Sequence, residues 1–280
     1  MPVYYLRMMA FFAVLIMLLL LWWSWQAYHR KKLKEKIAAM PFPESYRNVL
    51  QKIPHYQRLS EEDKHRIERS ILYFIHTKTF VGVKMEVTEE MKAVIAFYAC
   101  LLLLHLPQKG CYDALRTIIL YPSTVIYDAV RENGGIYTKE KFLIDGQSAG
   151  DTVVLVWHDA KFEAYHLRHE NVIVHEFAHE IDFMDGMADG VPPMERSKYH
   201  EWTSVLFKDY QKLHDVALKN REWGRYKLLG EYAATNEAEF FAVVTERFFE
   251  SPHSLKRHFP ELYEELKDFY RIDPVALVEK

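Results

Sequence analysis

The run His175-Glu176-Phe177-Ala178-His179 constrains the fold of this chain more than any other feature. It has the form H-E-x-x-H and lies in an apolar stretch that predicts a buried helix. Two histidines four residues apart point from the same helix face, one turn from each other. Both imidazoles can therefore bind one Zn²⁺ at about 2.0–2.1 Å. Glu176 can then accept a proton from the water that the zinc activates.

The alternative interpretation is a chance match made of ordinary core or surface histidines. The chain has 14 histidines, and most chance copies of the motif would fall on polar surface helices or in loops. In a buried helix, two unpaired imidazoles and a carboxylate are energetically costly. The position of the motif thus favours a metal site with His175 and His179 as ligands and Glu176 as the catalytic base.

A second strong feature is the apolar stretch between Met8 and Trp25, in which only Ser24 is polar. Its length is close to the ~20 residues that cross a bilayer as a helix. Tyrosine and tryptophan residues lie at its two ends, as at membrane interfaces. A cleavable signal peptide is the alternative, but the run exceeds the usual ~7–15 apolar residues and no small-residue cleavage pattern follows. Residues 8–25 are therefore predicted to be a single-pass anchor in the lipid bilayer.

The charges around this stretch predict its orientation. The segment His29–Lys36 contains five Lys/Arg residues, whereas Arg7 is the only one before the apolar run. Positive charge is retained on the cytoplasmic side of a membrane. We therefore expect the following domain to lie in the cytoplasm, as in a protein of a bacterial inner membrane.

Composition excludes several other classes of function. The net charge is −3 and the basic residues concentrate beside the anchor, so nucleic acid is not expected as a direct ligand. There are only two cysteines, Cys100 and Cys111. They predict neither a disulfide framework nor a cysteine-type metal site.

The chain is expected to contain an anchor with a basic juxtamembrane segment, residues 1–40, and a zinc-peptidase domain, residues 41–280. Within the latter, residues 41–130 form a helical part and residues 131–275 contain the active site. The fold class is α+β, mainly helical, with a zincin-like core and a small sheet packed on the H-E-x-x-H helix. Helices are predicted near 60–77, 88–106, 194–219, 236–250 and 260–270, strands at 116–121, 124–127 and 152–157, a turn at 133–135 and a Gly/Ser loop at 145–151.

A catalytic zinc needs a third protein ligand, and the residues alone leave several candidates. Asp185 has the offset of the extended H-E-x-x-H-x-x-G-x-x-H/D pattern, but Asp182 replaces the glycine that would reverse the chain. Glu239 and Glu246 lie on one face of an apolar helix and need a metal or a histidine as partner. Glu237 and Glu239 also suit the first turn of a helix without any metal. Asp182, one turn after His179, is a candidate hydrogen-bond partner for an imidazole.

Two segments together resemble the Mlc titration factor A family of zinc-dependent peptidases: His175–Asp182 (HEFAHEID) and Tyr232–Val243 (YAATNEAEFFAV). The resemblance extends from about Pro41 to Pro274. It implies that Glu239 completes the zinc site, because the preceding Ala and the following Phe-Ala-Val match. It also implies that Tyr232 stabilises the transition state.

The expected function is hydrolysis of peptide bonds by a zinc-activated water, with one Zn²⁺ per chain and aminopeptidase as a candidate specificity. The strand at 152–157, if it is an edge strand near the site, can pair with an extended peptide. In the resembled family, peptidase activity coexists with binding of a sugar-responsive transcriptional repressor. The alternative function is therefore a membrane-tethered regulatory binding protein with structural zinc and a protein regulator as its partner.

Overall fold

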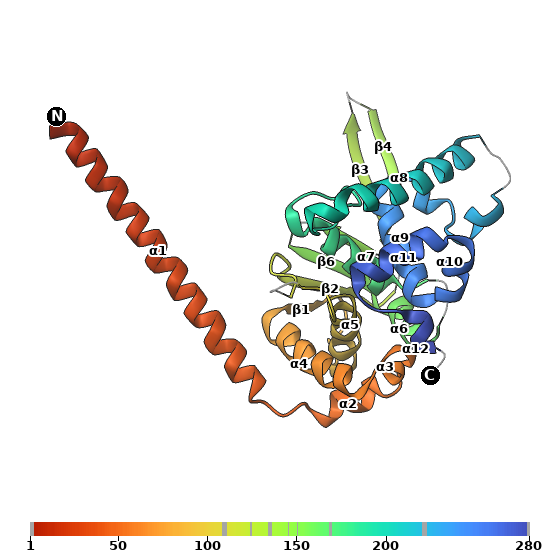
Figure 1. Cartoon of the computed structure of the whole chain (residues 1–280), viewed down its shortest axis with the longest axis horizontal. Coiled ribbons are helices and arrows are strands. Elements are labelled where there is room, and N and C mark those ends of the chain that lie inside the picture. Colours follow the sequence, from red (N-terminus) through yellow and green to blue (C-terminus); the bar gives the residue numbers. More distant parts are fainter. Residues whose placement is uncertain are drawn as a thin grey trace. The chain divides into compact units, whose positions relative to one another are not determined.

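The apolar N-terminal stretch forms one continuous helix, α1 (Val3–Ala38), drawn in red in Figure 1. The structure is a computed structural model that describes residues 3–107, 111–123, 125–133, 136–144, 146–149, 151–167, 170–219 and 223–278. Contacts divide the chain into two units, Met1–Phe42 and Pro43–Lys280. Within the described residues, one helical segment is long and apolar enough to cross a membrane, Arg7–Ile37.

The second unit begins with four helices: α2 (Glu44–Leu50), α3 (Pro54–Arg58), α4 (Glu61–Thr77) and α5 (Glu89–Leu102). The two long ones, α4 and α5, begin at hydroxyl caps. The side chain of Ser60 accepts a hydrogen bond from the Asp63 amide at 3.1 Å, and that of Thr88 accepts one from the Met91 amide at 3.3 Å. Helix α5 is buried along most of its length and packs against α4 and α7. It forms the centre of the core.

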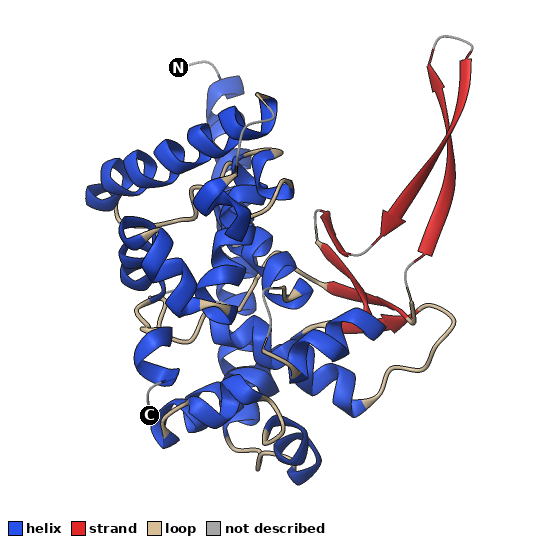
Figure 2. Cartoon of the chain, turned by 90° about the vertical axis from the view of Figure 1, so that its right-hand side faces the viewer, coloured by secondary structure: helices blue, strands red, loops and turns tan. Residues whose placement is uncertain are grey.

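The main sheet has four strands in the order β1-β2-β6-β5. The strands β1 (Thr79–Gly82), β2 (Thr117–Tyr121) and β6 (Thr152–Val156) are parallel, and β5 (Gly146–Ala149) pairs antiparallel with β6. Two further strands, β3 (Val125–Asn133) and β4 (Ile136–Ile144), form a separate antiparallel pair. Figure 2 shows this pair projecting beyond the main sheet.

One sequence prediction about this sheet is wrong, and one condition on its use is not met. The segment 145–151, predicted as a loop, contains the strand β5, because backbone pairing with β6 outweighs the low strand propensity of Gly-Gln-Ser-Ala. Strand β6 is not an edge strand, since it lies between β2 and β5. Its buried Val153 and Leu155 belong to the continuous apolar run typical of an interior parallel strand. The predicted turn at 133–135 falls largely outside the described residues.

After β6 the chain is helical, as Figure 1 shows. The elements are α6 (Trp157–Tyr165), α7 (Val172–Asp182), η1 (Phe183–Asp185), α8 (Arg196–Leu218), η2 (Gly224–Leu228), η3 (Tyr232–Ala234), α9 (Glu237–Glu250), α10 (Pro252–His258), α11 (Pro260–Tyr270) and α12 (Pro274–Val278). Helix α7 carries the H-E-x-x-H motif and contacts β5, β6, α5 and α9. The predicted fold class, a mainly helical α+β fold with a small sheet on this helix, is confirmed.

Candidate metal centre and active-site cleft

Two helices with asparagine caps bring the candidate metal ligands together. The side chain of Asn171 accepts from the Val174 amide at 3.2 Å and begins α7, which carries His175 and His179. The side chain of Asn236 accepts from the Glu239 amide at 2.9 Å and begins α9. Because α7 and α9 pack against each other, the first turn of α9 lies beside the second half of α7.

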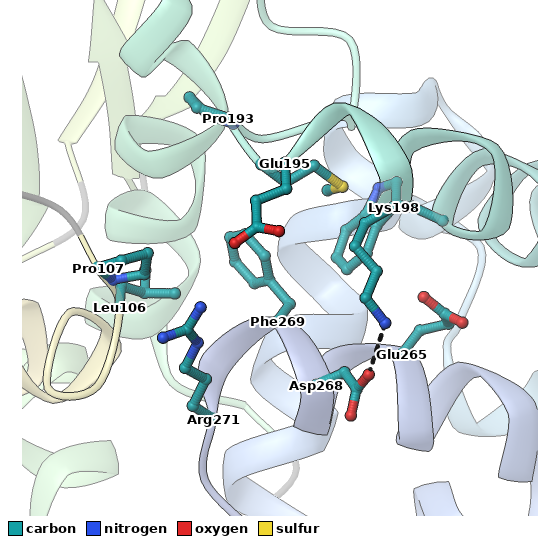
Figure 3. Close-up of a pocket in the computed structure, with 11 residues that line it drawn as sticks. Leu106, Pro107, Pro193, Glu195, Lys198, Glu265, Asp268, Phe269 and Arg271 are labelled. Atoms are coloured by element: carbon teal, nitrogen blue, oxygen red, sulfur yellow. Dashed lines mark hydrogen bonds and ion pairs between the residues drawn. The ribbon is translucent and has the colours of Figure 1, made fainter.

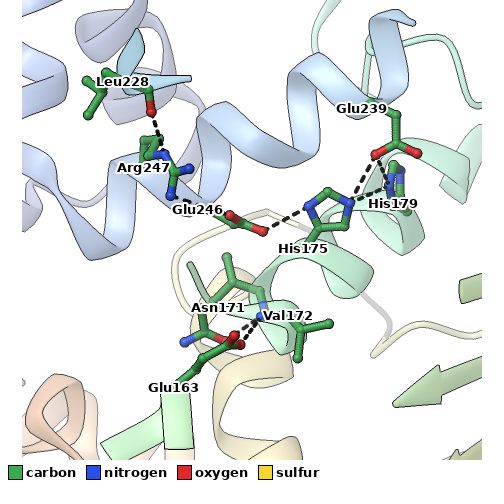
Figure 4. Close-up of polar contacts among 10 residues, drawn as sticks. Glu163, Asn171, Val172, His175, His179, Leu228, Glu239, Glu246 and Arg247 are labelled. Atoms are coloured by element: carbon green, nitrogen blue, oxygen red, sulfur yellow. Dashed lines mark hydrogen bonds and ion pairs between the residues drawn. The ribbon is translucent and has the colours of Figure 1, made fainter. Parts of the chain in front are cut away.

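The donor atoms of His175, His179 and Glu239 lie within 4.8 Å of one another. The two Nε2 atoms are 3.1 Å apart, and the Glu239 Oε2 atom lies 3.1 Å from Nε2 of His175 and 3.3 Å from Nε2 of His179 (Figure 4). Ligands bound tetrahedrally to Zn²⁺ at about 2.0–2.1 Å have about the same mutual separation. Two imidazoles and one carboxylate are also a donor set that Zn²⁺ accepts. The residues present therefore fit a metal ion.

The charges of this cluster favour a cation at its centre. Burial alone would lower the pKa of His175, but hydrogen bonds to Glu239 and Glu246 raise it to about 10. Burial would raise the pKa of Glu239, but hydrogen bonds from the two histidines hold it well below its usual range. The surrounding carboxylates thus stabilise positive charge where the three donor atoms meet.

Glu176 is buried beside this cluster and is 4% exposed. Its Oε2 atom has no hydrogen-bond partner among the described residues. Burial, together with the charges of neighbouring glutamates, raises the pKa of this carboxyl to about 8. A buried carboxyl oxygen without a partner is unfavourable in a purely structural role, and it suits a group that exchanges a proton with a substrate or a water.

A cleft of about 820 Å³ opens at the cluster, and both His175 and Glu176 line it. Tyr232 lines the same cleft from η3, with its ring centroid 5.8 Å from that of His175. Its side chain is 59% exposed. Burial of the phenol and the neighbouring Glu239 carboxylate raise the pKa of Tyr232 above its usual value, so the hydroxyl stays protonated and can donate a hydrogen bond.

Comparison with known proteins agrees with this geometry. The sequence model of the glucose-regulated metallo-peptidase M90 family matches residues 25–271. The chain belongs to this family. M90 proteins are metallopeptidases that require a metal ion, so both the resemblance seen in the sequence and the metallopeptidase class are confirmed.

Several relatives match over most of this M90 chain. An uncharacterized protein of Synechocystis sp. is 31% identical, and the match covers 90% of each chain. Mlc titration factor A of Serratia proteamaculans is 30% identical over 81% of this chain and 87% of its own. Mlc titration factor A of Klebsiella pneumoniae is 31% identical over 80% of this chain and 84% of its own.

The structure shows where the other acidic residues that were candidates for the third ligand lie. Asp185 lies in η1, where its Oδ1 atom accepts from the Met187 amide at 3.1 Å, and it is not part of the donor cluster. Glu237 also lies outside the cluster. The Oε1 atom of Glu246 lies 2.9 Å from Nδ1 of His175. His175 is therefore the histidine partner that a buried glutamate in this apolar helix was expected to need. Whether His175, His179 and Glu239 bind metal stays a prediction.

The prediction that Asp182 supports an imidazole is wrong. Its Oδ2 atom accepts from the Gly190 amide at 2.9 Å, because the chain turns back after α7 and brings that amide to the helix end. The carbonyl of Gly190 in turn accepts from the Trp202 indole at 3.1 Å. Asp182 therefore joins the end of α7 to the loop before α8.

Gly190, in this loop, has a backbone conformation and surroundings that disfavour any side chain. Its φ is +76°, and a Cβ atom there would lie 2.6 Å from the Glu237 carbonyl oxygen at the start of α9. Gly190→Ala should therefore lower the free energy of unfolding by more than the about 1–2 kcal/mol of a left-handed residue alone. The matched control is Gly230→Ala, with φ +80° and nothing within 4 Å of the added Cβ. Urea unfolding followed by tryptophan fluorescence measures both, and equal losses would contradict the prediction.

A second cavity, of about 330 Å³, lies between α8 and α11. Trp202 and Phe269 line it, and an ion pair of Lys198 and Asp268 at 3.0 Å crosses its rim (Figure 3). It shares no lining residue with the cleft at the donor cluster. It also contains none of the residues predicted to take part in hydrolysis.

Proposed function

We propose that this M90 protein is a membrane-anchored, zinc-dependent peptidase with an aminopeptidase-like preference. One observation carries the proposal. Two imidazole nitrogens and one carboxylate oxygen converge beside the unpartnered, buried oxygen of Glu176, at a cleft of about 820 Å³. Structural zinc needs no basic group at that position, whereas hydrolysis does.

His175, His179 and Glu239 hold the metal in this proposal. When bound, Zn²⁺ lowers the pKa of water and polarises the carbonyl of the scissile bond. A bound cation would favour the ionised form of the Glu176 carboxyl group. Glu176 would then accept the proton of the attacking water and donate it to the leaving amine. The protonated hydroxyl of Tyr232 donates to the oxygen on which negative charge develops.

Two features support a peptide in the cleft. Strand β5 is one of the two edge strands of the main sheet and contacts α7, so an extended peptide that pairs with its backbone would lie next to the helix that carries the motif. Four carboxylates besides Glu176 and Glu246 line the cleft, and Arg247 is the one Lys or Arg among its described lining residues. These four are Asp159, Glu163, Glu170 and Glu231. Such a surface favours a substrate with a positive group, and a free α-amino group is one.

The test compares two substrates that differ in one charge. Aminoacyl p-nitroanilides with a free α-amino group should show a kcat/KM about tenfold higher than their N-acetylated counterparts, the equivalent of about 1.4 kcal/mol. Added salt should reduce the difference. Equal rates for the two substrates would contradict the aminopeptidase preference. Hydrolysis of neither, in protein shown to contain zinc, would contradict the peptidase proposal itself.

Helix α1 is the anchor in this proposal. Its large apolar side chains between Met8 and Trp23 are 39–68% exposed, so the helix does not bury them itself. The basic residues of His29–Lys36 follow on one side. We propose that they remain in the cytoplasm, where they also meet anionic lipid headgroups.

The orientation is tested with reporter fusions at the C-terminus. A fluorescent-protein fusion should be bright and an alkaline phosphatase fusion inactive, because the reporter stays in the cytoplasm. Replacing the five basic residues of His29–Lys36 by glutamine should weaken this preference. The same change at five exposed basic residues on or directly after α8 should not: Arg196, Lys198, Lys208, Lys212 and Lys219. An active phosphatase fusion of the unaltered chain would reverse the topology.

A protein regulator is a second proposed partner. The observation is that curated relatives bear the name Mlc titration factor A, which describes an action on another protein. A membrane-tethered protein could sequester such a partner at the inner face. Wild-type protein that binds zinc but hydrolyses no member of a broad peptide panel would favour this function over peptidase activity.

A further inference from the structure

The second ring nitrogen of His175 has a partner that the proposed chemistry does not use. Its Nδ1 atom lies 2.9 Å from Oε1 of Glu246, while its Nε2 atom faces Glu239 and His179. A neutral imidazole carries one ring hydrogen, and a carboxylate can only accept. In the neutral ring that metal binding requires, this hydrogen lies on Nδ1, next to the Glu246 carboxylate, which leaves the lone pair of Nε2 directed at the donor cluster.

Glu246 is the middle member of three contacts between α7 and α9. Along the two helices, Glu239 forms an ion pair with His179, Glu246 hydrogen bonds with His175, and Glu250 accepts a hydrogen bond from Asn171. Residues 171, 175 and 179 are spaced by single helical turns, and the three glutamates lie on the face of α9 toward them. Figure 4 shows the first two of these contacts. The antiparallel arrangement fixes which carboxylate each side chain meets.

The Glu246 carboxylate is also held from its other side. It is 6% exposed, and its Oε2 atom lies 3.8 Å from Nη1 of Arg247. The Nε atom of Arg247 donates to the Leu228 carbonyl at 2.8 Å, which ties α9 to the segment that leads to Tyr232 (Figure 4). The carboxylate thus lies between the His175 ring, with which it shares a hydrogen bond, and the Arg247 guanidinium, which attracts it by charge. Turning it away from His175 would break a buried hydrogen bond.

Within the described part of the chain, Nδ1 of His179 has no carboxylate in the corresponding position. The contacts of His179 are made through Nε2, to His175 and to Glu239. Of the two imidazoles, only that of His175 is thus oriented by the buried carboxylate of Glu246. A substitution at Glu246 would therefore disturb the orientation of His175 and not that of His179.

We infer that Glu246 is a positioning residue: it fixes the tautomer and ring orientation of His175 so that Nε2 points at the metal. It does not bind the metal, because its oxygen lies on the opposite side of the ring. The inference rests on the proposed metal site. Groups that orient a metal-binding histidine in this way typically contribute a 10- to 100-fold change in metal affinity.

The experiment measures zinc affinity of the full chain in detergent, by competition with a chromophoric chelator. Glu246→Gln keeps the shape and an acceptor but loses the charge, and should weaken zinc binding about tenfold. Glu246→Leu removes the acceptor and should weaken it about 100-fold. If the leucine variant does not fold, the isosteric glutamine variant decides.

Glu250→Gln is the matched control, because Glu250 is a buried carboxylate on the same helix that hydrogen bonds to Asn171 at 2.7 Å. It should lower the Tm of the metal-free protein but leave zinc affinity within about twofold of wild type. Glu246 belongs to the cleft lining but is only 6% exposed. Because it acts through His175 in this role, Glu246→Gln at saturating zinc should reduce kcat more than it changes KM. Zinc affinity unchanged in Glu246→Gln, or lowered equally in Glu250→Gln, overturns the inference. Wild-type protein that binds no zinc would instead contradict the proposed function.

Discussion

Glu176→Gln is expected to lower the turnover of peptide hydrolysis by about 10²- to 10⁴-fold while the protein still binds zinc. The amide has the shape of the carboxyl group but cannot accept the proton of the attacking water. The metal donors, His175, His179 and Glu239, are unchanged, so zinc content measured by elemental analysis should match wild type. Steady-state rates with an aminoacyl p-nitroanilide provide the activity measurement.

Asp185→Asn is the control for this variant. It removes a carboxylate in the helical turn that follows the motif, where Asp185 bonds to the Met187 amide and lies outside the cleft lining. Its rate should stay within about twofold of wild type. If Glu176→Gln retains wild-type turnover, Glu176 is not the base, and the unpartnered oxygen of its side chain needs another explanation.

Glu239→Ala is expected to be purified with little zinc and without measurable activity. Loss of one of three protein ligands removes a direct bond to the metal, and the remaining two histidines hold it only weakly. Glu237→Ala, two residues earlier in the same helical turn, and Asp185→Ala should both retain about one zinc per chain. Metal content after dialysis against a weak chelator measures all three variants.

The opposite result is equally informative. A zinc-poor Asp185→Ala beside a zinc-replete Glu239→Ala would require the chain to reverse after His179, which the contact of Asp182 with the Gly190 amide opposes. Mild and equal losses in all variants would mean that Zn²⁺ is held by a different set of residues.

Local signals in the sequence were sufficient to predict the helices of the core and of the site. Helices were predicted near 60–77 and 88–106, and α4 and α5 do begin there, capped by the side chains of Ser60 and Thr88. The H-E-x-x-H spacing predicted one helix face with both histidines, and His175 and His179 do lie on it with their Nε2 atoms 3.1 Å apart. Such signals act within a few residues, so no knowledge of the rest of the chain is needed to interpret them.

What the sequence could not predict depends on contacts between distant segments. Strand β5 exists because its backbone pairs with β6, and its own residues carry no strand preference. Asp182 has the correct spacing for a partner of His179, but the loop that returns to Gly190 supplies a closer donor. Glu246 was expected to need a metal or a histidine as its partner. The packing of α9 on α7 decides that this partner is Nδ1 of His175.

The long separation between the parts of the donor cluster has a consequence for synthesis of the protein. Glu239 follows His179 by 60 residues (239 − 179 = 60), and helix α8 lies between them. A growing chain therefore contains α1 and both histidines well before it contains Glu239. Under the proposed function, such a chain would reach the membrane before its metal site is complete. Hydrolytic capacity would then arise only after α9 has docked on α7, so the proposal implies that the unfinished chain does not cleave itself or its neighbours.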